Sequence, residues 1–412
     1  MNDQRLSIKT NIIWNTAGNF VYLFSQWLLT YVVVLTLGYG EAGVFSLAMS
    51  IGNSLSTIAT YTMRNYQVSD IAHSFSDSTY KVSRYATSLL ALAVCIVFIA
   101  LNGYSAYIAS CIAVFMVFKI SEAISDVYQG ILQKESRMDF IGISFIIKGV
   151  SGVFVFTTTI LVTQSLLLAL LALCLVSFAV VIFYDKTRAS SFSSKKPEPA
   201  QRAEVVALLK ICFPIAVFGL LFNSMGQLPR YFLEAQLGTE MLGIYASVAM
   251  PVVIVQVSAS FIFAPLTTPF AAYLDKEDMY SFKRLFAKVL FFIGGLSAVA
   301  LLTFGLFGEW LLQLLLGSSI IDYVYLVMPL VVCTILTAVS WFLSTVLIIT
   351  RKLKELLVVS ILAFAIVAAG SVPSINGYGM NGASFVLIAA LVVFVAGNAI
   401  ALAGDIRQKK KR

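Results

Sequence analysis

Long apolar segments recur along the whole chain and constrain its fold more than any other feature. Each is about as long as a helix must be to cross the hydrocarbon core of a bilayer, roughly 17–25 residues. The chain is 59% hydrophobic and only 12% charged, which is far from the composition of a soluble protein. We therefore expect an all-α polytopic membrane protein with about twelve transmembrane helices, near residues 12–37, 43–63, 85–101, 106–127, 140–162, 166–184, 211–234, 242–265, 289–308, 323–349, 356–373 and 383–403.

The basic residues are distributed asymmetrically across the predicted membrane. Of the 28 lysines and arginines, all but Lys119, Lys148 and Arg230 fall in segments that the helix count places on one side. The loops on the other side carry acids but no lysine or arginine. By the positive-inside rule the basic side is the cytoplasm, and both termini are expected there. The net charge of +8 is then explained by the membrane topology and by contact with anionic lipid headgroups, not by nucleic-acid binding.

The sequence argues against several classes of protein. Its five cysteines all lie in predicted spans, without metal-ligand spacing, which disfavours a disulfide framework. A single histidine, His73, lies in a predicted loop, so a histidine-based metal site or catalytic triad is not expected. No GxxxxGK[ST] phosphate loop occurs, and the outward loops are short. We therefore expect no enzyme, no cofactor and no metal.

The polar stretch "DKTRASSFSSKKPEPAQRAE" divides the chain into two halves of six spans. We expect a first bundle at 1–184, a cytoplasmic linker at 185–210 and a second bundle with a basic tail at 211–412. A motif of Leu-Gly, four residues and a second Gly begins at Leu37 and recurs at Leu237, between the first two spans of each half. Because six spans return the chain to its starting side, the two bundles are predicted to be related by a pseudo-two-fold axis along the membrane normal.

Polar side chains form stripes along several spans. In the first and seventh spans they recur at intervals of i, i+4, i+7 and i+11, which places each set on one helix face. Such stripes either bind helices together or line a cavity, and both readings stay open for the uncharged residues. The members are Asn15, Asn19, Tyr22 and Gln26 in the first span and Asn223, Gln227, Arg230 and Glu234 in the seventh.

Charged residues inside spans carry the functional expectations, because a charge at the bilayer centre costs about 2.5–3.5 kcal/mol on insertion scales. Arg230 either is neutralised by Glu234 or faces a cavity to meet an anion such as phosphate. Lys148 has no acid near it in sequence and either snorkels or meets the same anion. Lys119, Glu122 and Asp126 share one face of the fourth span. They either neutralise one another or bind a proton or Na⁺, with Asp126 the preferred ion ligand.

Several segments resemble bacterial polysaccharide transporters. These are the N-terminal run "IIWNTAGNFVYLFSQWLLTYVVVLTLGYGEAGVFSLAMSIGN", then "RNYQVSD", "KISEAISDVYQGILQKESRMDF", "GISFIIKGVSGVF", "RYFLEAQLGTEMLGIYASVAMP" and "GYGMNGAS". The resemblance covers essentially the whole chain. It is to the Wzx-type O-antigen and capsule repeat-unit flippases of the multidrug/oligosaccharidyl-lipid/polysaccharide (MOP) exporter superfamily.

This resemblance implies a V-shaped pair of six-helix bundles around a cationic cavity in the bacterial cytoplasmic (inner) membrane. Such proteins move undecaprenyl-diphosphate-linked oligosaccharide from the cytoplasmic to the outer leaflet. It implies Lys148, Arg230 and Arg64 as phosphate partners, and Asn15, Asn19, Gln26, Asn223 and Gln227 as sugar ligands. Asp126, Glu122 and Glu234 are then candidates for H⁺ or Na⁺ coupling, and membrane lipids and a polysaccharide polymerase are candidate partners.

The chain departs from the related lipid II flippases in one respect. They carry an Arg-Asp pair in the first span, where this chain has only uncharged polar residues, so a phosphate site is expected on spans five and seven instead. Two alternatives stay open. One is an ion-coupled multidrug exporter of the same superfamily, and the other is a membrane glycosyltransferase or ligase. Repeat-unit class, coupling ion and substrate stringency are not specified by the sequence.

Overall fold

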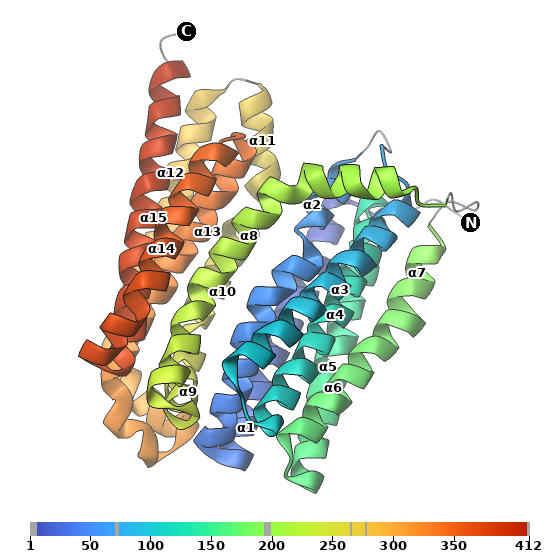
Figure 1. Ribbon diagram of the computed structural model, residues 1–412. Coiled ribbons are helices and arrows are strands. Elements are labelled where there is room, and N and C mark those ends of the chain that lie inside the picture. Colours follow the sequence, from blue (N-terminus) through green and yellow to red (C-terminus); the bar gives the residue numbers. More distant parts are fainter. Residues whose placement is uncertain (1–5, 71–73, 193–198, 264–265, 277, 410–412) are drawn as a thin grey trace. The chain divides into compact units, whose positions relative to one another are not determined.

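The computed structural model describes residues 6–70, 74–192, 199–263, 266–276 and 278–409. Helices fill these ranges and no strand occurs in them. His73, part of the predicted linker (193–198) and the last three residues of the basic tail lie outside the described residues. The helices in chain order are α1 Ile8–Thr60, α2 Met63–Ser69, α3 Asp77–Asn102, α4 Ala106–Lys134, α5 Met138–Thr163, α6 Leu166–Val180, the π-turn η1 Val181–Asp185, α7 Lys186–Ser190, α8 Arg202–Leu237, α9 Thr239–Val252, α10 Ile254–Phe263, α11 Thr267–Asp275, α12 Met279–Leu316, the 3₁₀ segment η3 Ser318–Leu326, α13 Val327–Ile349, α14 Leu353–Tyr378 and α15 Met380–Lys409 (Figure 1).

The predicted membrane spans are confirmed. Within the described residues, eleven helical segments are long and apolar enough to cross a bilayer. The first of them, Lys9–Val68, contains two predicted spans, because α1 leaves helical geometry at Gly38 (φ 84°, ψ −177°). The Thr30 hydroxyl reaches the Met49 sulfur at 3.9 Å, although 19 residues separate them. A straight helix would hold these residues about 28 Å apart, so α1 is a hairpin that turns at Gly38.

The two halves share the conformation of this first turn. Gly238, between α8 and α9, has φ 89° and ψ 169°, close to the values at Gly38. Few residues other than glycine adopt such angles, because a Cβ atom would clash with the backbone. The recurrence of a Leu-Gly motif in the sequence is therefore matched by a recurrence of backbone geometry at both glycines. This agreement supports the predicted internal repeat.

Contacts divide the chain into two compact units, Met1–Asn223 (unit 1) and Ser224–Arg412 (unit 2). Helix α8 runs from one unit into the other. The predicted bundle limits of 184 and 211 concern the membrane topology and stay a prediction.

Unit 1 packs α3, α4, α5 and α6 side by side around the α1 hairpin, as Figure 1 shows in blue to green. Serine side chains begin several of these helices: Ser76, Ser105 and Ser165 each accept a hydrogen bond from the backbone N–H three residues on. Helices α1 and α5 approach so closely at Gly18 and Gly142 that their backbones touch. Small residues permit such contact between membrane helices.

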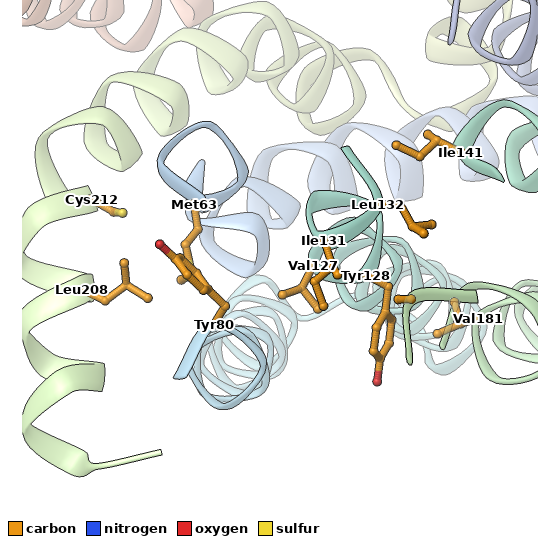
Figure 2. Packing of buried hydrophobic residues seen from close by; sticks show 11 residues of the cluster. Met63, Tyr80, Val127, Tyr128, Ile131, Leu132, Ile141, Val181, Leu208 and Cys212 are labelled. Carbon is orange, nitrogen blue, oxygen red and sulfur yellow. The ribbon is translucent and has the colours of Figure 1, made fainter. Parts of the chain in front are cut away.

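The core of unit 1 contains an apolar cluster next to α4. Val127, Tyr128 and Ile131 of α4 pack with Met63 and Tyr80, and Figure 2 shows this cluster from close by. All five cysteines of the chain are buried and none forms a disulfide, in agreement with their prediction as small hydrophobic residues.

Substitution of Gly142 by alanine tests the close approach of α1 and α5. A Cβ atom at position 142 would overlap the Trp14 carbonyl group, which is backbone and cannot rotate away. Overpacking of this kind costs about 1–3 kcal/mol. We therefore expect Gly142→Ala to lower the midpoint of thermal unfolding in detergent by several degrees.

The matched control is Gly305→Ala in α12, where a Cβ atom would meet open space. Alanine is favoured over glycine in a helix, so this variant is expected to unfold at the wild-type temperature or slightly above it. Equal behaviour of the two variants would contradict the close contact of α1 and α5.

Candidate functional site

A polar cavity of about 210 Å³ lies within unit 1, among its membrane-spanning helices. Helix α4 supplies most of the lining, α1 and α2 supply Ser56, Thr60 and Arg64, and α5 supplies Phe145 and Lys148. The charged lining residues are Arg64, Lys119, Glu122, Asp126 and Lys148. Three of them are basic and two acidic, so the lining carries a formal charge of +1. An intramembrane cavity of this sign favours an anionic ligand.

The sequence of α4 explains why it can serve both the cavity and the core. Lys119, Glu122, Asp126 and Gln129 recur at intervals of three and four residues and lie on one helix face. Residues 127, 128 and 131 lie on the opposite face, in the apolar cluster of Figure 2. The second half of α4 is thus amphipathic inside a membrane protein, with its polar face turned to the cavity.

Asp126 lies between two arginines. One carboxylate oxygen is 3.1 Å from Arg64 Nη1 and the other is 2.8 Å from Arg84 Nη2. Arg84 is fully buried and also donates to the Ala59 carbonyl at 3.1 Å. From the sequence, Asp126 was the preferred candidate to bind a proton or Na⁺. Its two cationic partners already satisfy its charge, which makes it a poor place for a further cation.

Lys148 is also paired. Its ammonium group is 2.9 Å from the Asp185 carboxylate, and Ser125 bridges the two by accepting from Lys148 and donating to Asp185. The side chains of Lys148 and Asp185 are 5% and 0% exposed. Asp185 closes the π-turn η1, a one-turn widening of the helix that often occurs at functional sites.

Gln129 joins these two ion pairs into one network. Its side-chain oxygen accepts from Arg64 at 3.0 Å, and its nitrogen donates to Ser125 at 3.0 Å. A continuous path of hydrogen bonds therefore runs from Arg84 through Asp126, Arg64 and Gln129 to Lys148 and Asp185. A ligand that attracts one of the cations would perturb the whole path.

Lys119 and Glu122 form a separate pair on the same face, with the Lys119 nitrogen 2.7 Å from a Glu122 oxygen. The ammonium group also lies 5.5 Å and 5.4 Å from the ring centres of Phe115 and Phe118. Among the described residues Glu122 forms this one ion pair, whereas Asp126 forms two. Glu122 is therefore the cavity acid with fewer direct ion pairs.

The predicted amide ligands in unit 1 lie outside this cavity. On α1, Asn19 donates to Asn15 at its carbonyl (2.8 Å) and side-chain (3.1 Å) oxygens, and Gln26 is half-buried. Asn223 donates to the Thr57 hydroxyl at 3.0 Å and so joins α8 to α1. The Asn223 contact matches the alternative in which amides hold helices together, whereas the Asn19 contacts lie within α1.

Arg230, Gln227 and Glu234 belong to unit 2. Among the described residues no ion pair joins Arg230 to Glu234 or to another acid. Arg230 lies near Tyr245 and Cys333 instead, and Tyr245 shares a 2.9 Å hydrogen bond with Ser384. The Gln227 side-chain oxygen is buried and finds no hydrogen-bond partner in the described part of the chain. The sequence left open whether Glu234 neutralises Arg230. The described residues show no ion pair between the two side chains.

Sequence reasoning missed three parts of the network. Arg84 was counted among the loop cations, Asp185 was placed at the start of the linker, and Ser125 and Gln129 were not singled out. One signal was available for the last two, because Ser125 and Gln129 lie on the polar face of α4 beside Asp126. No local signal pointed to Asp185, whose partner Lys148 is 37 residues away. In the described ranges no group of three or more His, Cys, Asp or Glu is placed to hold a metal ion.

The fold is similar to that of solved MATE and other MOP superfamily transporters. The chain superposes on the Vibrio cholerae MATE transporter VcmN with a TM-score of 0.65 at 15% identity, covering 98% of this chain and 96% of that one. A MOP superfamily transporter from Pyrococcus furiosus gives 0.63 at 14% identity, with 98% and 96% covered. The fold therefore defines a multi-pass membrane protein with the architecture of MOP superfamily transporters, and the predicted fold class is confirmed.

A more specific relative is found by sequence. The capsular polysaccharide biosynthesis protein CapF of Staphylococcus aureus is 24% identical over 389 residues, which cover 90% of this chain and 94% of that protein. No family model matches the chain. The resemblance to polysaccharide transporters of the MOP superfamily is thus confirmed.

Substitution of Asp185 tests the buried ion pair. Asp185→Ala would leave the Lys148 ammonium buried without its counter-charge, and removal of one partner from such a pair costs about 3–5 kcal/mol. We expect a loss of this size in the free energy of unfolding measured by denaturant titration in micelles. The double variant Lys148→Met/Asp185→Leu, which removes both charges, is expected to recover most of it.

Asp322→Ala, at an exposed acid of η3, is the matched control and should leave the unfolding free energy within about 0.5 kcal/mol of wild type. If the double variant is as unstable as Asp185→Ala, the Lys148–Asp185 pair does not stabilise the protein through charge compensation.

Proposed function

We propose that this protein is a flippase for surface-polysaccharide biosynthesis, which translocates undecaprenyl-diphosphate-linked oligosaccharide repeat units by alternating access. The observation that carries the proposal is the net positive cavity of unit 1, which is lined by residues of the membrane-spanning segments. A lipid-linked diphosphate has the opposite charge. The relative in capsular polysaccharide biosynthesis supports the same class of cargo.

Lys148 and Arg64 are proposed as the phosphate partners in unit 1. Both line the cavity, and both are held by acids at its wall: Lys148 by Asp185 and Arg64 by Asp126. A phosphate oxygen entering the cavity would compete with these carboxylates for the same N–H donors. The prior pairing keeps the cations tolerable in the membrane while the cavity is empty.

The remaining proposed roles rest on residue type and position. Arg230 in unit 2 is proposed as a further phosphate partner, since no described acid neutralises it. Asn15, Asn19, Gln26, Asn223 and Gln227 stay candidate sugar ligands, although Asn19 and Asn223 already donate to other residues. Glu122, which forms one ion pair where Asp126 forms two, is a better candidate for H⁺ or Na⁺ coupling than Asp126, and Glu234 is a candidate in unit 2.

The site and orientation follow from the same proposal. The basic termini and loops would face the cytoplasm, and the protein would lie in the bacterial inner membrane. O-antigen, capsule and other undecaprenyl-linked precursors are all compatible cargoes. A polymerase that consumes the flipped unit is the natural partner on the outer face.

A multidrug exporter is the second candidate, and the fold similarity to MATE transporters favours it. Many drugs handled by such exporters are organic cations. The +1 lining of the unit 1 cavity would repel them, whereas it attracts a phosphate. Export of an organic cation by the purified protein in vesicles would therefore support this candidate against the flippase.

Complementation tests the flippase. In a strain that lacks its own repeat-unit flippase, the wild-type chain is expected to restore surface polysaccharide when the matching sugar is made. The variant Lys148→Met/Asp185→Leu removes one of the three cavity cations without leaving an unpaired acid, and Arg64→Gln removes another. We expect each to reduce surface polysaccharide at least tenfold at equal membrane abundance.

Lys9→Gln, which removes an exposed cation of α1, is the control and should complement fully. If the two cavity variants complement as well as Lys9→Gln does, Lys148 and Arg64 are structural. Failure of the wild-type chain with each sugar tried would instead count against the flippase itself.

A further inference from the structure

Unit 2 contains a second cavity, and its chemistry differs from that of the first. It measures about 300 Å³ and is lined by residues of α12, α13 and α15. Nine of the ten lining residues are apolar, and Lys283 is the only charged one. An apolar groove with one cation suits an amphipathic ligand and not a sugar or an ion.

The position of the groove fixes its depth in the membrane. Its lining comes from the beginning of α12 and from the later parts of α13 and α15, which are the ends that carry the basic loops. Lys283 lies one turn into α12, in the basic segment with Arg284 and Lys288. Leu290 lies seven residues further on, about 10 Å deeper along the axis. The groove therefore runs from headgroup depth into the acyl region.

The floor of the groove belongs to the core of unit 2, while its rim is open. Phe282, Leu343 and Val346 are buried at its base, whereas Leu290 is 37% exposed. The next two residues of α12, Phe291 and Phe292, are 80% and 60% exposed, as lipid-facing side chains are. The groove thus opens toward the bilayer.

Lys283 is available to a ligand. Its side chain is exposed, and no described acid forms an ion pair with it. Nearby, Lys352 donates to the Ala401 carbonyl at 3.3 Å, beside the groove residue Leu402. Lys352 also lies 3.8 Å from the Glu355 carboxylate, which offsets its charge. Lys283 is therefore the cation that makes the interfacial end of the groove positive, and the described lining contains no carboxylate.

We propose that this groove binds one anionic phospholipid of the leaflet at the basic ends of the helices. Its phosphate would contact Lys283, and one acyl chain would lie between α12, α13 and α15. The positive charge of Lys283 favours an anionic headgroup over a zwitterionic one. Anionic lipids are also abundant in the cytoplasmic leaflet, where the basic ends of the helices are expected. The bound lipid would fasten the first turns of α12 to α13 and α15. This site is independent of the cargo proposed above.

The test is native mass spectrometry of the full chain in detergent, with added phosphatidylglycerol or phosphatidylcholine of the same acyl chains. The wild-type protein is expected to bind the first phosphatidylglycerol about fivefold more tightly than phosphatidylcholine. Lys283→Gln should abolish this preference. Lys288→Gln removes the same charge from α12 at a position outside the groove, and should retain it.

A second variant tests the apolar part of the groove. Ala399→Phe places a ring where the acyl chain would lie, and should weaken binding of both lipids while leaving the thermal unfolding midpoint unchanged. Three outcomes would overturn the proposal. They are an unchanged preference in Lys283→Gln, an equal loss in Lys288→Gln, and tighter binding of undecaprenyl phosphate than of phosphatidylglycerol with the same dependence on Lys283 and Ala399. The last would identify the occupant as a polyprenyl carrier.

Discussion

The arrangement of unit 1 depends on how its buried charges are compensated. A guanidinium as completely buried as that of Arg84 is tolerated only with a counter-charge and hydrogen-bond acceptors nearby. Asp126 supplies the charge and the Ala59 carbonyl supplies an acceptor. Because α3, α4 and α1 all contribute, compensation of this one side chain fixes how three helices meet. The cavity forms beside this junction, where the same carboxylate also holds Arg64.

The fold could be predicted from the sequence because it rests on local and periodic signals. Apolar length located the long apolar helices of the described residues, whereas the orientation inferred from the basic loops stays a prediction. Gly38 and Gly238 marked equivalent turns, since their backbone angles are open almost only to glycine. The one apparent discrepancy, eleven helical segments against twelve spans, arises because the hairpin at Gly38 is continuous helix on both sides of a single residue.

The site was predicted only in part, and the reason lies in sequence distance. Lys119 and Glu122 are three residues apart, so their pairing could be anticipated from helical geometry. Lys148 with Asp185 and Arg64 with Asp126 are pairs between helices, separated by 37 and 62 residues. Which faces of α2, α4, α5 and η1 meet is decided by packing across the whole unit. No spacing rule for one helix contains that information.

The π-turn at Val181–Asp185 has a consequence for the phase of the helix that contains it. A π-turn accommodates about one residue more than an α-turn, so side chains beyond it are rotated by roughly 100° from their course in an uninterrupted helix. Asp185 is brought toward Lys148 in this rotated phase. Relatives of different length in this turn would present a different side chain to that lysine, so a one-residue insertion or deletion can retune the cavity without altering any residue that lines it.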